Sequence, residues 1–210
     1  MASNRRYDTT KRSAAAQATR QRILESARAL FGRQGIDDVT IARIAKKADV
    51  APATVFALFK SKTGILQAIM KESLFGPHFQ AAQALMDGVS DAALLVALTA
   101  KVARAIYESE SRDLGLMRGS SAFSPTLRKL ERRFEDMRYE MQADRLEQLF
   151  QQGKAREGLD LETARRIMWM YTSRDIYLML VHEGKWTPEA YETWLERTLC
   201  EALVRQNPNS

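Results

Sequence analysis

Residues 40–62 read TIARIAKKADVAPATVFALFKSK, and this stretch decides the fold. Thr40 precedes apolar residues at helical spacing, so we expect it to cap a short first helix. Asp49-Val50 predicts a turn, and Pro52 suits the first position of a second helix. Small or apolar residues fall on the sides where the two helices would meet. The stretch therefore predicts a helix-turn-helix, whose second helix turns its outward side chains to a partner.

Helical spacing also recurs on both sides of this stretch, with capping residues between the segments and almost no strand pattern. We expect an all-α protein of about nine helices, with an N-terminal three-helix domain followed by a second helical domain. The expected parts are a flexible basic arm (1–16), the helix-turn-helix domain (17–62), a helical domain (63–205) and a disordered tail (206–210). A fourth helix, from Lys62, would link the two domains.

Positive charge gathers at the N-terminal end of the chain. Residues 1–62 hold 13 Lys and Arg against 5 Asp and Glu, while the remainder holds 19 against 21. A basic head beside a near-neutral body favours a polyanionic partner, although a solubilising basic tail would look the same. One cysteine allows no internal disulfide, and neither a signal segment nor an apolar run of membrane-spanning length is present. We therefore expect a cytoplasmic protein without membrane contact.

The stretch and the helix before it, Thr19 to Met70, resemble the DNA-binding segment of the TetR family of bacterial regulators in spacing, turn and the closing F-K-S-K. Residues 76–210 resemble such proteins in architecture only, although Trp186–Leu203 also looks like a last helix seen in some members. Three positions depart from the family pattern: Asp49 replaces a glycine, Ala51 a capping serine, and Phe56 a tyrosine whose hydroxyl touches a phosphate in the family. Leu58 also stands where histidine or tyrosine is common.

The resemblance implies binding to double-stranded DNA at a near-palindromic operator. We expect apolar contacts to thymine methyl groups from the second helix, and phosphate contacts from the cations around it. The basic arm would supply the missing donors to a minor groove, or add electrostatic attraction alone. The expected DNA-binding residues are Thr40, Arg43, Lys46, Pro52, Ala53, Thr54, Phe56, Ala57, Lys60 and Lys62, with Arg5, Arg6, Lys11 and Arg12 in the arm.

Two further surfaces are expected in residues 63–205. Residues 161–181 are apolar almost all round, so a second subunit would cover one side and form a homodimer; a monomer with a thick core is the alternative. The expected dimer residues are Trp169, Tyr177, Tyr191, Trp194, Leu195, Thr198, Leu199 and Ala202. An effector pocket would be lined by Met86, Leu98, Val102, Ile106, Met117, Phe123, Phe134, Met137 and Met141, although such stripes are more often core.

The function expected from these features is that of a DNA-binding transcription regulator, a repressor that a small molecule of unknown identity releases from its operator. A ligand-independent regulator or architectural protein is the alternative. Catalysis is not expected: the two histidines, His78 and His182, have no metal-binding spacing, and no nucleophile or phosphate-loop motif occurs. We expect no metal and no cofactor.

Overall fold

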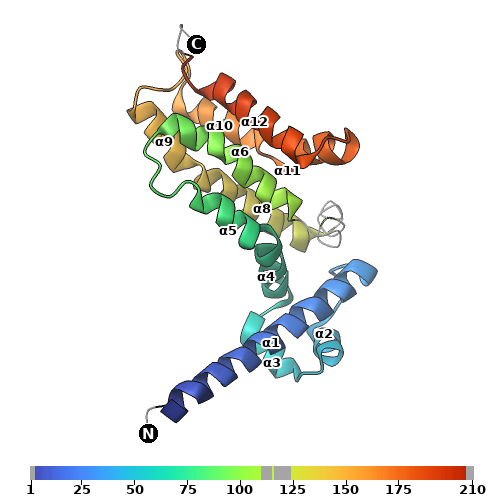
Figure 1. Cartoon of the computed structure of the whole chain (residues 1–210). Helices are drawn as coiled ribbons and strands as arrows, with labels where there is room; N and C mark the ends of the chain where they lie inside the picture. Colours follow the sequence, from blue (N-terminus) through green and yellow to red (C-terminus); the bar gives the residue numbers. More distant parts are fainter. Residues whose placement is uncertain (1–2, 110–114, 116–123, 207–210) are drawn as a thin grey trace. The chain divides into compact units, whose positions relative to one another are not determined.

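A computed structural model describes residues 3–109, 115 and 124–206, with the side chains from residue 14 onward (Figure 1). All the named secondary-structure elements of the described residues are helices, beside one isolated bridge between Ala155 and Val204, which confirms the all-α prediction. Contacts divide the chain into an N-terminal unit, Met1–Glu72 with Ser111–Glu131, and a C-terminal unit, Ser73–Glu110 with Arg132–Ser210. The division at residue 72 falls within the helix expected to link the domains, rather than at residue 62.

The N-terminal unit is built on the long helix α1 (Ser3–Gln34), beside which α2 (Ile41–Ala48) and α3 (Pro52–Phe59) lie (Figure 1). Helix α4 (Lys62–Leu74) begins in this unit and extends into the next. Apolar side chains from all four helices form a core without solvent exposure. Its fully buried members include Ile23, Leu24, Ile44, Val55, Ile65 and Leu66.

Residues 3–16 differ from the flexible arm expected there, because they form the first turns of α1. This segment lacks an apolar face, which is why the sequence analysis assigned no helix to it. Alanine, arginine, lysine and glutamine nevertheless have high helix propensity, and such residues dominate residues 11–20. A helix already begun at Thr19 can therefore extend backwards without tertiary support.

The C-terminal unit consists of packed helices, of which α6 (Ala92–Glu108) and α12 (Pro188–Leu203) share the largest contact. Helix α5 (Pro77–Ala84) lies on another side of α6, as does α9 (Ala143–Gln151), which follows α8 (Pro125–Met141). Helix α10 (Leu161–Tyr171) packs on α9 and α12. Within the described residues no helix combines the length and apolar character of a membrane span.

The apolar stretch 161–181 is not one helix. Helix α10 ends at Tyr171, α11 (Arg174–Tyr177) starts after Ser173, and the chain continues as a π-helix, η2 (Leu178–Glu183). Ser173 accepts a hydrogen bond from the Ile176 amide, so its hydroxyl competes with the helix ladder and begins a new helix. The break changes which sides of this segment are buried.

Candidate nucleic-acid interface

Helix α2 and the turn after it have the predicted caps. The Thr40 hydroxyl accepts a hydrogen bond from the Arg43 amide at 3.3 Å, as an N-cap does. Asp49 ends the helix in the left-handed region, with a φ of 53°. Its backbone N–H donates hydrogen bonds to the carbonyl oxygens of Ala45 and Lys46. A residue with a short polar side chain tolerates this conformation better than most. Asp49 therefore takes over the turn that a glycine forms in the resembling family.

Helix α3 is anchored by two apolar side chains and exposes the rest of its surface. Pro52 stands in its first turn and Ala51 makes no side-chain cap, as expected. Val55 and Phe59 are buried in the N-terminal unit. The outward face consists of the exposed Pro52, Ala53, Phe56, Ala57 and Leu58, with Thr54 half-buried.

Two of these outward side chains are large and apolar. Phe56 is 57% exposed and Leu58 is 43% exposed. Two large exposed apolar groups on one short helix form a surface that another molecule could bury. Phe56 was among the expected DNA-binding residues and Leu58 was not, although the position of Leu58 in the helix already places it outward.

Cations surround this face. Arg43 and Lys46 on α2 and Lys60 at the end of α3 are exposed. Lys60 has a φ of 62°, so the chain turns there from α3 toward α4. Lys62 is half-buried, and its ammonium group donates a hydrogen bond to the Asp37 carbonyl at 3.0 Å. That bond uses one of three donors and leaves others for a phosphate.

The helices behind this face are held by charge and by close packing. Arg20 of α1 forms an ion pair with Glu72 of α4, and Arg28 approaches the same carboxylate at 3.5 Å. The Arg20 guanidinium also lies 5.3 Å from the centre of the Phe59 ring, as in a cation–π contact. At the start of α4, a methyl group on Gly64 would lie 2.0 Å from the Phe59 carbonyl oxygen. Only glycine fits there, so Gly64 fixes the angle between α3 and α4.

The arm residues Arg5, Arg6, Lys11 and Arg12 lie on the first turns of α1, and their side chains are outside the described part of the structure. An α-helix is about 10–12 Å across with its side chains, whereas the minor groove is about 6 Å wide. A helical arm cannot enter that groove as an extended one does. The helix therefore differs from the extended arm on which the expectation of minor-groove reading rested.

Several expected dimer residues are core of a single subunit. Tyr177, Tyr191, Leu195 and Leu199 are buried, and burial raises the pKa of the Tyr191 hydroxyl. They cannot face a partner, which corrects that part of the expectation. The remaining residues, Trp169, Trp194, Thr198 and Ala202, are half-exposed. The last three lie one turn apart on α12, and the exposed large side chains of the same unit include Met170, Met179 and Trp186.

The expected pocket residues do not share one environment. Met86, Val102, Ile106 and Phe134 are buried, Leu98 is half-buried, and Met137 and Met141 are exposed. Met117 and Phe123 lie outside the described residues. Phe134 stacks on Phe75 with ring centres 6.0 Å apart. The four buried side chains are core of the C-terminal unit in this structure. On α8, Phe134 lies on the buried face as expected, but that face continues through Arg138 and not through Met137.

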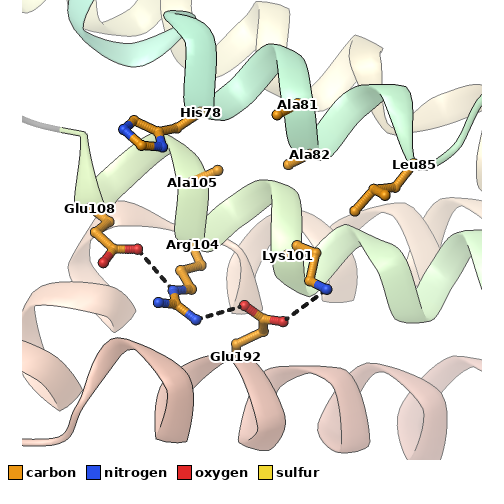
Figure 2. A pocket seen from close by; sticks show the side chains of 9 residues that line it. All are labelled: His78, Ala81, Ala82, Leu85, Lys101, Arg104, Ala105, Glu108 and Glu192. Carbon is orange, nitrogen blue, oxygen red and sulfur yellow. Dashed lines mark hydrogen bonds and ion pairs between the residues drawn. The ribbon is translucent and has the colours of Figure 1, made fainter.

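A surface hollow between α5, α6 and α12 contains none of the expected pocket residues (Figure 2). Figure 2 shows Ala81 and Ala82 on α5, with Leu85 directly after it, next to α6, whose Lys101 and Arg104 side chains point toward Glu192 of α12. The charged side chains that line this hollow form ion pairs with one another. Arg104 donates to Glu108 at 2.8 Å and to Glu192 at 3.1 Å, and it also pairs with Glu189.

This network ties α6 to α12. Bonding to Glu108 in particular raises the pKa of the Arg104 guanidinium, and Lys101 adds a contact to Glu192 at 3.7 Å. With its ion pairs complete, the hollow offers no free charge to a ligand and is best explained as a joint between the two helices.

Two buried arginines of the C-terminal unit were missed by the sequence analysis. Arg138 donates to the Trp169 carbonyl at 2.6 Å and to the Thr172 hydroxyl at 2.7 Å, and pairs with Glu135. Within the described part of the chain, Arg145 donates hydrogen bonds to Thr99 and Gln83. Arg145 lies four residues after Met141 and four before the buried Leu149, so a charged residue on an apolar stripe was the signal. Among the described residues no cluster could hold a metal ion.

The fold and the exposed face of α3 define a helix-turn-helix protein with a helical C-terminal unit. Residues 23–69 match the model of the bacterial regulatory proteins of the tetR family. The N-terminal segment of this chain belongs to that family. A curated relative, the HTH-type transcriptional regulator SrpR of Pseudomonas putida, is 42% identical over 60 residues, or 29% of this chain and 28% of the relative. The chain thus matches little more than a quarter of that relative's length.

Solved structures resemble more of the chain. The crystal structure of NalD, the secondary repressor of the MexAB-OprM multidrug efflux pump in Pseudomonas aeruginosa, covers 92% of this chain and 100% of its own, with 21% identity and a TM-score of 0.69. A transcriptional regulator from Saccharomonospora viridis in complex with choline covers 89% and 98%, with 22% identity and a TM-score of 0.62. At such identities the likeness is one of fold.

Proposed function

We propose that this chain is a sequence-specific DNA-binding transcription regulator that acts as a homodimer and carries out no catalysis. The observation that carries the proposal is the exposed face of α3: Phe56 and Leu58 are exposed to solvent, while Val55 and Phe59 of the same helix are buried in the N-terminal unit. A helix held from behind can enter the major groove with its outward side chains. Action on DNA implies a cytoplasmic protein.

In this proposal, α3 recognises DNA bases mainly through apolar contacts. Pro52, Ala53, Phe56, Ala57 and Leu58 present hydrocarbon, which packs on thymine methyl groups, and the half-buried Thr54 is the only outward residue of α3 with a side-chain hydrogen-bonding group. Thymine-rich half-sites follow from such a surface.

The phosphate backbone is contacted by the cations around that face. The Arg43, Lys46, Lys60 and Lys62 side chains, together with the Thr40 region at the start of α2, position the helix on the duplex. The basic first turns of α1, which carry Arg5, Arg6, Lys11 and Arg12, add attraction to phosphate without base reading.

Two subunits meet, in this proposal, through the half-exposed stripe of α12 formed by Trp194, Thr198 and Ala202. The exposed Met170, Met179 and Trp186 supply further apolar area, which a partner would remove from water. A twofold dimer reads two half-sites about one helical turn apart, so its operator is near-palindromic.

Regulation by a small molecule is the last part of the proposal. NalD is named a repressor, and the Saccharomonospora viridis regulator was solved with choline, which supports repression relieved by a ligand in this chain too. A ligand lowers operator affinity by the difference in its own affinity for the two conformations. A ligand-independent DNA-binding protein is the alternative, and its operator affinity would not change with any small molecule.

The test is a titration of labelled duplexes at several salt concentrations, with random-sequence DNA as competitor. The proposal expects a steep fall of log affinity with log salt concentration, as counterions leave the phosphates, and tighter binding to a selected duplex than to random DNA. The matched control is Lys101→Ala, which removes a cation of the C-terminal unit and should leave the slope unchanged. Absence of a salt slope, or equal affinity for both duplexes, would refute the proposal.

A further inference from the structure

A second surface hollow lies on the exposed side of α12, where two tryptophan rings form a corner. The centres of the Trp186 and Trp194 rings are 6.1 Å apart, and the ring planes stand at 84° to each other. The hollow has a volume of about 550 Å³, and Trp186 is 38% exposed. This tryptophan corner is lined by Trp186, Glu189, Ala190, Thr193, Trp194 and Arg197.

The two indole rings of the corner have no cation over them, unlike another aromatic ring of the same unit. Arg165 and Arg166 lie 4.2 Å and 4.7 Å from the centre of the Tyr139 ring. Within the described part of the chain, no guanidinium or ammonium group lies over Trp186 or Trp194. Because the face of an indole ring attracts positive charge, the corner is a place where a further cation is stabilised.

The same side of α12 carries a carboxylate in excess. The hollow of Figure 2 is lined by two cations and two carboxylates, so its charges balance; they belong to Lys101, Arg104, Glu108 and Glu192. Glu189 is a third carboxylate on the Arg104 guanidinium, and it lines the tryptophan corner instead. Its side chain is 66% exposed. A cation in the corner would therefore meet this carboxylate as well as the indole rings.

Arg197 is a cation on the same helix face. Its side chain is 72% exposed, and its ion pair with Glu201 measures 3.9 Å, at the limit for such a contact. Ala190, Trp194 and Arg197 are spaced by four and three residues, so they lie on one side of α12. The face thus holds both a site for a cation and a cation that does not occupy it. Such a surface is complementary to a second copy of itself, as an isologous interface requires.

We propose that the homodimer is held by two reciprocal contacts, in which Arg197 of each subunit enters the tryptophan corner of the other. A twofold axis perpendicular to α12 makes the two copies of this helix antiparallel. When the axis passes between Thr193 and Trp194, Ala190 lies opposite the partner's Arg197. The small side chains of Ala190 and Thr193 permit a close approach, and Glu189 faces the incoming guanidinium. This inference rests on the proposed function, since it names the contact between the two subunits.

The test measures the dissociation constant of the dimer by sedimentation equilibrium, with the full chain and without DNA. Arg197→Met keeps the apolar stem and removes the charge. Because each dimer loses two contacts, its dissociation constant should rise at least about tenfold. Arg166→Met is the matched control: Arg166 also forms an i,i+4 ion pair, but it already lies over Tyr139 of its own subunit, so wild-type dimer affinity is expected. A wild-type dissociation constant in Arg197→Met overturns the inference.

A double-mutant cycle shows whether Arg197 acts through the tryptophan rings. Trp186→Leu alone should also weaken the dimer. Combined with Arg197→Met, it should add little to the larger of the two single effects, because both changes remove the same contact. Full multiplication of the two effects would count against the inference. Arg197→Lys should lie between Arg197→Met and the wild type, since an ammonium group is also attracted to an indole face.

A dissolved organic cation is the other occupant that the corner could hold, although Arg197 at its edge repels one. Calorimetry with tetramethylammonium chloride tests it. Binding that Trp186→Leu abolishes, together with unchanged dimerisation of Arg197→Met, would make the corner a small-molecule site and overturn the inference.

The two proposals fail in different ways. A dimer that forms independently of Arg197 refutes this contact alone and leaves the homodimer standing. A wild-type chain that stays monomeric refutes both the contact and the homodimer, and the operator titration then shows whether DNA binding survives.

Discussion

Replacing Phe56 with alanine tests whether the exposed face of α3 is a binding surface. The side chain is 57% exposed, and it is not part of the N-terminal core. A phenylalanine contributes roughly 150 Å² of area, so about 85 Å² remains to be buried on DNA; at about 25 cal/mol per Å² this is worth about 2 kcal/mol. Operator affinity should therefore fall by about 30-fold, with most of the change in dissociation rate.

Fluorescence anisotropy with the selected duplex gives this affinity, and thermal unfolding shows whether the fold is kept. The unfolding temperature should stay within about one or two degrees, since surface substitutions change stability by less than about 0.5 kcal/mol. Leu94→Ala is the matched control, because Leu94 is a comparably exposed apolar residue of the C-terminal unit. An unchanged operator affinity in Phe56→Ala would refute the reasoning, and so would an equal loss in Leu94→Ala.

The remaining predictions concern the support and chemistry of the same face. Phe59→Ala removes a buried ring and should lower the free energy of unfolding by about 3–5 kcal/mol, measured by denaturant titration; a loss below about 1 kcal/mol would contradict its place in the core. Gly64→Ala should cost about 1–3 kcal/mol, because the added methyl group meets the Phe59 carbonyl, and a stabilised variant would show that the α3–α4 angle is free to change. Thr40→Ala should cost about 1 kcal/mol through loss of the cap, whereas Thr40→Ser should not. Phe56→Tyr should tighten operator binding by about 1 kcal/mol, since it restores the hydroxyl that reaches a phosphate in the resembling family; weaker binding would place the ring away from the backbone.

Local signals in the sequence predict where many helices begin. Thr40 was expected to be a cap and accepts a hydrogen bond from the first turn of its helix, and Asp160 and Thr187, which are also residue types preferred at N-caps, do the same. The exposed face of α3 was predictable as well, because Val55 and Phe59 lie one turn apart and fix the inner side. For short helices with clear caps, the sequence therefore predicts both the helix start and the buried face.

What could not be predicted depends on long helices and on tertiary partners. Met137 was expected to face inward, but after the buried Leu130 and Phe134 the 3.6-residue turn of a straight helix buries Arg138 and leaves Met137 exposed. Arg145 was not assigned a role because its partners, Thr99 and Gln83, are distant in sequence and belong to other helices. The first turns of α1 were missed because helix propensity without an apolar face leaves no periodic pattern.

Selection of bound duplexes from a random pool of double-stranded DNA tests the central claim most directly. The account predicts an enriched inverted repeat with thymine-rich half-sites, whose centres are about one helical turn, or a multiple of it, apart. The Phe56→Ala protein should enrich the same repeat more weakly. A pool that stays random after selection, or a single unrepeated site, would contradict a dimer that reads DNA with the outward face of α3.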